Sequence, residues 1–159
     1  MPAPHWLRPH EERAWRAWRR MSTLLDLEIA RDLARDSGLS APDYDVLSTL
    51  SEAARGAWRA HALAERLSWS TSRLAHHVQR MEQRRLVTRA PDPTDRRGAL
   101  VALTDDGWSA LTAAAPAHVL SVRRHFVDLC SSEELATLEA LAARVVARME
   151  GHGEVEAAE

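Results

Sequence analysis

Hydroxyl, imidazole and guanidinium groups are concentrated in one stretch near the middle of the chain, "SWSTSRLAHHVQR", from Ser68 to Arg80. The hydroxyl groups come first, at Ser70, Thr71 and Ser72. A helix that begins at these residues presents free backbone N–H groups and a positive dipole end, which favour phosphate. The cationic side chains that follow can bind phosphate or the edge of a guanine. This combination indicates a polyanion site.

The same stretch predicts a helix over residues 71–85 with two different faces. The apolar residues recur at steps of three and four and predict a buried stripe of Leu74, Val78 and Met81. The opposite face presents Ser72, Arg73, His76, Arg80 and Gln83. Arg73 is the candidate for base reading, because a guanidinium forms a bidentate contact with guanine. His77 lies on the flank, where packing and phosphate contact both stay open.

A second basic cluster, "PDPTDRRG" at residues 91–98, lies between the aliphatic runs "LVTRA" and "ALVAL". Two such runs around a loop of Pro, Asp, Thr and Gly predict a β-hairpin with a long tip. Arginines at a loop tip can enter a narrow minor groove, and Arg96 and Arg97 are placed for this. Asp95 is interpreted as a brace that orients Arg97.

Charge is distributed unevenly along the chain. Residues 55–97 carry ten arginines and four acidic residues, a net +6, whereas the remainder carries −8 and the whole chain −2. A positive surface on an acidic body is typical of a nucleic-acid site, although solvated helix faces also collect arginines.

Turn and capping signals divide the chain into the elements that would position these clusters. We predict a long helix from His10 to Asp36, a second helix capped by Ser40, a short helix at residues 61–67, the helix and hairpin above, and two terminal helices. The predicted fold class is mainly α with a small β-hairpin wing, a winged helix-turn-helix. Within a single structural domain, we assign residues 39–115 to the DNA-binding region and 151–159 to a frayed acidic tail. We assign residues 1–38 and 116–150 to dimerisation helices, although their apolar stripes could also simply cover their own subunit's core.

The stretch "LAERL…SRLAHHVQRMEQRRLVTRAPDPTDRRGALVALTDDG" resembles the MarR family of transcriptional regulators. Its most specific part is the wing tip with Asp95 and Arg97, followed by an aliphatic strand and "LTDDG". The resemblance implies a homodimer that binds double-stranded DNA at a palindromic operator, usually as a repressor released by a small molecule or by oxidation. Two residues depart from the family pattern: Arg85 stands where glycine is usual, and His77 where an aliphatic residue is common.

The resemblance also implies an effector pocket, for a small aromatic or phenolic molecule. Residues of suitable chemistry on the predicted helices are Trp15, Trp18, Tyr44 and His118, although each is also a candidate for plain packing. A redox-sensing regulator that uses Cys130, the only cysteine, is an alternative.

Other classes find little support in the sequence. It contains no nucleophile elbow, phosphate loop, dinucleotide fingerprint or compact set of metal ligands, so we expect no enzyme, no cofactor and no metal. It also lacks a membrane-length apolar run, a secretory signal and a transit peptide, so we expect a cytoplasmic protein. A winged-helix module that binds protein instead of DNA stays open, and the salt dependence of duplex binding would distinguish the two.

Overall fold

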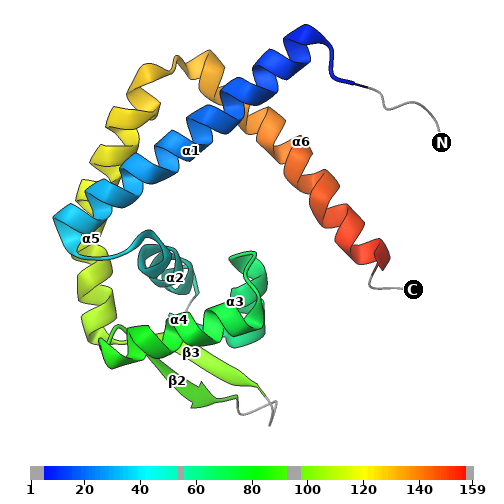
Figure 1. Ribbon diagram of the computed structural model, residues 1–159. Helices are drawn as coiled ribbons and strands as arrows, with labels where there is room; N and C mark the ends of the chain where they lie inside the picture. The colour runs from blue at the N-terminus through cyan, green and yellow to red at the C-terminus, as the bar shows by residue number, and fades with distance from the viewer. Residues whose placement is uncertain (1–5, 54–55, 93–97, 157–159) are drawn as a thin grey trace. The chain divides into compact units, whose positions relative to one another are not determined.

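The computed structural model describes residues 6–53, 56–92 and 98–156, with only the backbone described from residue 151 onward (Figure 1). The chain folds as two compact units, Met1–Ser121 and Val122–Glu159. The first unit contains the helix-turn-helix region and the whole sheet.

The long helix α1, Pro9–Ser37, ends at Gly38, whose φ of 69° is left-handed, as the sequence predicts. Helix α2, Ala41–Ser51, begins at Ser40 with a complete capping box, in which Ser40 and Asp43 bond each other's backbone N–H groups. These capped ends fix the short turn between α1 and α2.

Helix α3, Ala60–Arg66, and helix α4, Thr71–Gln83, form the helix-turn-helix pair. The turn between them ends at Ser70, whose hydroxyl accepts the N–H of Arg73. Beyond α4, Arg85 adopts a φ of 59°. The chain therefore turns here in the left-handed conformation that glycine favours, even though the residue is arginine.

Three antiparallel strands form the wing: β1, Ala57–Arg59, β2, Val87–Pro91, and β3, Ala99–Leu103. Their order is β1-β3-β2, so β3 pairs on both sides. Pairing runs from Val87 opposite Leu103 to Pro91 opposite Ala99, which confirms the predicted hairpin.

Helix α5, Asp105–His125, is capped by Thr104, whose hydroxyl accepts the N–H of Gly107 and donates to the carbonyl of Arg85. The second unit continues with a short 3-10 helix, Val127–Leu129, and helix α6, Ser132–Glu156. Ser131 caps α6 through the predicted capping box, in which Ser131 and Glu134 bond each other's backbone N–H groups.

The C-terminal boundary of α6 lies beyond residue 151, because its helical backbone continues to Glu156. The frayed tail that the sequence predicts from residue 151 stays a prediction. Each residue added to an existing helix gains a backbone hydrogen bond without a new nucleation cost, so the two glycines in this segment do not end the helix.

The core lies in the first unit, where α2, α3, α4 and the sheet meet (Figure 1). Its fully buried side chains come from all four, namely Val46, Leu47, Leu50, Leu63, Val78, Met81 and Val101. A buried hydrogen bond of 2.8 Å from the Ser121 hydroxyl to Asp32 ties α5 to the C-terminal part of α1. The core side chains thus pack the helix-turn-helix pair against the wing, and the hydrogen bond fixes α5 against α1.

Within the described ranges, no helix combines the length and the apolar character needed to cross a membrane.

Candidate nucleic-acid interface

The N-terminus of α4 is exposed and capped by side chains of the preceding turn. Ser70 accepts the N–H of Arg73 at 3.2 Å, and its hydroxyl also lies 3.2 Å from that of Ser72. Thr71 and Ser72 are exposed at the same end. The remaining N–H groups of the first turn have no partner within the helix, so this end can receive an anion.

The two faces of α4 divide as the sequence predicts. Leu74, Val78 and Met81 are buried, and the opposite side exposes Ser72, Arg73, His76, Arg80 and Gln83. Arg73 and Arg80 are seven residues apart, so they lie on one side of the helix two turns, or about 10 Å, from each other. A single exposed face therefore presents two guanidinium groups.

Several arginines of the basic segment are already paired with carboxylates. The pairs are Arg59 with Asp92 at 2.8 Å, Arg66 with Glu52 at 3.4 Å, Arg84 with Asp43 at 2.6 Å and Arg89 with Glu82 at 2.7 Å. Among the described arginines of this segment, Arg73, Arg80 and Arg85 form no such pair. The net charge of residues 55–97 thus overstates the cations available to DNA.

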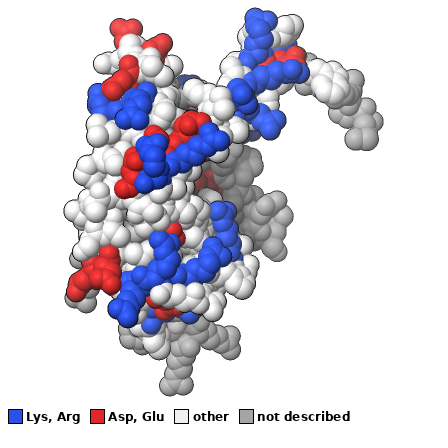
Figure 2. Space-filling view, turned by 60° about the vertical axis from the view of Figure 1, so that its left-hand side comes forward, with Lys and Arg blue, Asp and Glu red and all other residues white. Residues whose placement is uncertain are grey.

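Arginine side chains gather in the lower part of the face in Figure 2, at the height of α4 in Figure 1, with acidic side chains beside them. This view agrees with the mixture of paired and unpaired arginines.

Trp69, which sequence reasoning missed, supports Arg73. The guanidinium carbon of Arg73 lies 4.1 Å from the centre of the Trp69 ring, a cation–π contact. Trp69 occupies the position just before the N-cap of α4, where an apolar residue often fixes how the chain enters a helix. That position, together with the spacing of four residues to Arg73, could have predicted from the sequence that Trp69 contacts Arg73.

His77 does not fit the predicted set of DNA contacts. It is only 7% exposed, its Nδ1 lies 2.9 Å from the Arg80 guanidinium, and its Nε2 lies 3.1 Å from Asp43. The ring therefore packs against α2, and this burial favours packing, the first of the two predicted alternatives. Its flank position between Leu74 and Met81 turns it into the core.

Asp43, only 3% exposed, joins α2 to α4. It accepts the Ser40 N–H at 3.0 Å and the Arg84 guanidinium at 2.6 Å. Burial alone would raise the pKa of Asp43, but the hydrogen bonds from Arg84 and Ser40 outweigh it and hold the pKa below its usual value. Burial lowers the pKa of His77, while the neighbouring Asp43 opposes that shift. The pair is thus a carboxylate beside a neutral imidazole.

The wing tip, with Asp95, Arg96 and Arg97, lies outside the described residues. The strands β2 and β3 on either side of it are described, and their ladder runs to Pro91 and Ala99. The predicted role of the tip stays a prediction.

The four predicted pocket residues form two separate pairs. Trp15 and Trp18 stack on α1 with ring centres 5.2 Å apart and are 51% and 50% exposed. Tyr44 and His118, from α2 and α5, lie with ring centres 4.3 Å apart.

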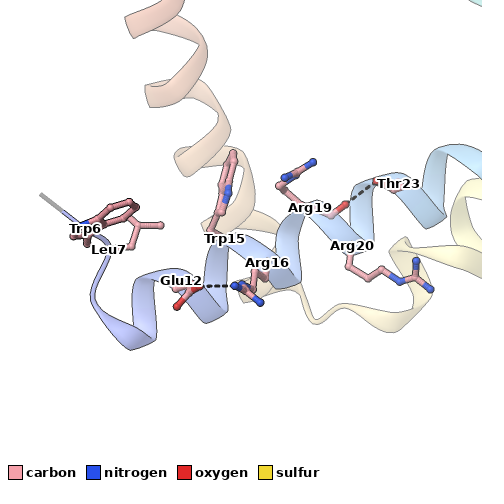
Figure 3. Close-up of a pocket in the computed structure, with 8 residues that line it drawn as sticks. All are labelled: Trp6, Leu7, Glu12, Trp15, Arg16, Arg19, Arg20 and Thr23. Atoms are coloured by element: carbon pink, nitrogen blue, oxygen red, sulfur yellow. Dashed lines mark hydrogen bonds and ion pairs between the residues drawn. The ribbon is translucent and has the colours of Figure 1, made fainter. Parts of the chain in front are cut away.

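Trp15 lines an open groove of about 820 Å³ along the first half of α1, beside arginines that point outward (Figure 3). The other lining residues are Trp6, Leu7, Glu12, Arg16, Arg19, Arg20 and Thr23. Because the groove is open to solvent, it suits a macromolecular surface better than a small ligand.

The Tyr44–His118 pair is half buried. Burial lowers the pKa of His118, although the neighbouring carboxylate of Asp45 opposes this shift, and burial raises the pKa of Asp45. Nδ1 of His118 is buried without a hydrogen-bond partner among the described residues. Of the predicted pocket residues, this pair places an unbonded buried nitrogen, Nδ1 of His118, next to the aromatic ring of Tyr44.

A metal site and a reactive cysteine are the two other kinds of chemical centre to consider among the described residues. The described residues contain no group of three or more potential metal ligands. Cys130 is partly exposed and unpaired, just before the cap of α6.

The structure combines a helix-turn-helix pair with an antiparallel wing, and the exposed second helix carries two arginines without a described carboxylate partner. These features define a DNA-binding protein of the winged helix-turn-helix class. Comparison with known proteins agrees. Residues 37–98 match the model of the MarR family. The chain is 32% identical over 129 residues to the HTH-type transcriptional regulator PecS of Dickeya dadantii, which spans 79% of this chain and 75% of PecS. The chain belongs to the MarR family of transcriptional regulators, which are not enzymes.

Solved structures give the same result. AbsC, a MarR family transcriptional regulator from Streptomyces coelicolor, is 36% identical with a TM-score of 0.88, over 93% of this chain and 99% of AbsC. Sco3205, from the same organism and solved in complex with DNA, is 35% identical with a TM-score of 0.86, over 92% of this chain and 91% of Sco3205. The resemblance and the fold class expected from the sequence are both confirmed.

Proposed function

We propose that this regulator acts as a homodimer that binds a palindromic operator and represses transcription until a small aromatic or phenolic molecule releases it. The observation that supports DNA reading is the exposed face of α4, where Arg73 and Arg80 have no carboxylate partner among the described residues. The solved complex of the similar Sco3205 with DNA supports the same use of the fold. As a transcriptional regulator, the protein would work in the cytoplasm.

In the proposed complex, α4 enters the major groove and its N-terminal residues face the DNA. Arg73 reads a base edge, Arg80 and His76 contact phosphate or bases, and the N–H groups at Ser70, Thr71 and Ser72 hold phosphate. The wing arginines Arg96 and Arg97, braced by Asp95, enter the adjacent minor groove.

The test uses a duplex identified by footprinting DNA next to the protein's own gene, with affinity measured by fluorescence anisotropy. Arg73→Ala should weaken binding by about 1–3 kcal/mol and relax preference at one base step. Arg66→Ala is the matched control, because Arg66 is exposed on α3 but paired with Glu52. An Arg73 variant that binds like the control would refute the assignment of α4, and an equal loss on every duplex would make Arg73 a phosphate contact.

Salt dependence tests the wing. Arg97→Ala should weaken binding and reduce the slope of log affinity against log salt by about 1. An unchanged slope would remove the wing from the interface. A salt-independent affinity for all duplexes would favour a module that binds protein.

Exposed apolar side chains support the dimer. On α1 they are Trp15, Trp18, Met21, Leu24 and Leu27, and on α6 they are Leu141, Val145, Val146 and Met149. We propose that the helices within residues 1–38 and 116–150 bury these side chains against a second copy, including the open groove on α1. Sedimentation equilibrium should give twice the chain mass of 17.8 kDa. Val145→Arg should shift this toward the monomer, and a wild-type monomer would refute the proposal.

For the effector we propose the Tyr44–His118 pair. A phenolic ligand can stack on Tyr44 and bond the buried Nδ1 of His118, which otherwise lacks a partner among the described residues. Candidate phenols should release the operator duplex, and His118→Leu should abolish the release while leaving DNA affinity intact. Release that is undiminished in this variant would exclude the pair.

A further inference from the structure

His77 is a buried polar residue within the otherwise apolar inner side of α4. Its neighbours on that side, Leu74, Val78 and Met81, pack into the core. A buried imidazole in such a place must satisfy its two ring nitrogens, and this costs free energy unless both find partners. The partners of His77 link it to the arginines on the exposed face of α4.

The contacts of His77 fix its tautomer. The Arg80 guanidinium has only donors, so at 2.9 Å it donates to Nδ1 and the ring proton lies on Nε2. Nε2 lies 3.1 Å from Oδ1 of Asp43, a close contact that is poorly aligned for a hydrogen bond. Asp43 is itself held by Ser40 and Arg84, so the imidazole sits between a fixed carboxylate and the exposed Arg80 side chain.

The same ring also supports the second arginine of the exposed face. The indole of Trp69 lies edge-on to His77, with ring centres 5.4 Å apart and planes at 85°. Arg73 lies over that indole at 4.1 Å. His77 therefore supports both arginines of the exposed face. It bonds the guanidinium of Arg80 directly, and it contacts the Trp69 ring over which the guanidinium of Arg73 lies.

We propose that His77 is a positioning residue that fixes the directions of Arg73 and Arg80 before DNA arrives and so sets the base selectivity of α4. This inference rests on the proposed function, because it assumes that both arginines contact DNA. A long arginine loses rotamer freedom when it binds, and a side chain already held in place loses less. Base edges require one direction of the guanidinium, whereas phosphates accept several, so selectivity depends on positioning more than non-specific affinity does.

The test compares operator and scrambled duplexes for His77→Leu, an apolar replacement of similar size. We expect about a tenfold loss of operator affinity, with affinity for the scrambled duplex and the salt slope unchanged. His77→Gln, which keeps a donor and an acceptor, should recover part of the selectivity. His10→Leu, an exposed histidine at the start of α1, is the matched control. Circular dichroism checks folding, and if the leucine variant is unfolded the glutamine variant carries the comparison.

A double-mutant cycle separates positioning from packing. In an Arg73→Ala, Arg80→Ala background, His77→Leu should cause no further loss of operator affinity. An equal loss on both duplexes, or a loss that persists in this background, would overturn the positioning role. If the two arginine substitutions themselves leave operator binding unchanged, the proposed use of α4 fails. If they weaken it and His77→Leu does not, only the positioning role fails.

Discussion

Asp43 offers the sharpest test of what holds the DNA-binding region together. It is almost fully buried and has three partners on three segments: the Ser40 N–H, the Arg84 guanidinium and Nε2 of His77. The perturbation is Asp43→Ala, which removes the carboxylate but creates little cavity.

The expected cost is the sum of unequal parts. Losing half of the capping box of α2 costs about 1 kcal/mol. The contact of Nε2 of His77 with Asp43 is poorly aligned for a hydrogen bond, so losing it adds about 0.5–1 kcal/mol. Arg84 is half exposed and regains water, so its share is at most about 0.5 kcal/mol. The total is about 1.5–2.5 kcal/mol of unfolding free energy, and Asp43→Asn, which keeps an acceptor oxygen, should cost about half as much.

The assay is urea unfolding followed by circular dichroism at one fixed protein concentration, because dimerisation links stability to concentration. Glu65→Ala is the control: Glu65 lies on α3 of the same region, is exposed, and should change stability by less than about 0.5 kcal/mol. A cost below about 1 kcal/mol for Asp43→Ala, or equal costs at the two positions, would refute the assignment of Asp43 as the junction.

The pH dependence has a definite sign. Because the folded-state pKa of Asp43 is lowered, the folded protein holds fewer protons there than the unfolded chain does. The stabilisation is complete above the ordinary aspartate pKa of about 3.9 and is lost as the pH falls through the lower folded value. Because Asp43 also raises the pKa of His77, both proteins in this comparison carry His77→Leu, and the difference that Asp43→Asn makes should then be constant from about pH 5 to 7 and shrink below about pH 4. A difference that grows in acid would contradict this.

Two further predictions concern backbone positions. Gly107→Ala should destabilise by about 3 kcal/mol in urea unfolding, because a Cβ there would lie 2.0 Å from the carbonyl oxygen of Leu86. Gly38→Ala, where φ is 69° but nothing lies within 4 Å, should cost only about 1 kcal/mol, and equal costs would refute the steric argument. Arg85→Gly should stabilise by about 0.5–1 kcal/mol, because Arg85 adopts a left-handed φ of 59° that glycine adopts without strain. A loss of stability would mean that the Arg85 side chain contributes more than the strain costs.

The order of the elements was predictable because its signals are local. Ser40 with Asp43, and Ser131 with Glu134, are capping boxes within three residues, and both form. The two faces of α4 followed from helical periodicity alone, and the hairpin followed from two aliphatic runs around a turn-forming loop. Such features depend on neighbours in the sequence, so no tertiary contact is needed to infer them.

The pairing of charges was decided only by the tertiary structure. Arg84 and Asp43 are 41 residues apart, and the Ser121–Asp32 hydrogen bond spans 89 residues. Sequence spacing does not reveal which arginine meets which carboxylate, because the answer depends on how α2 packs against α4 and on how α5 packs against α1. The same packing buries His77, which periodicity placed on the flank, and leaves Arg73 and Arg80 without a carboxylate partner in the part of the chain that the structure describes. The sequence by itself thus determined the helices, the wing and the basic character of the segment, and only the packing between distant elements decided which of its cations are available to a ligand.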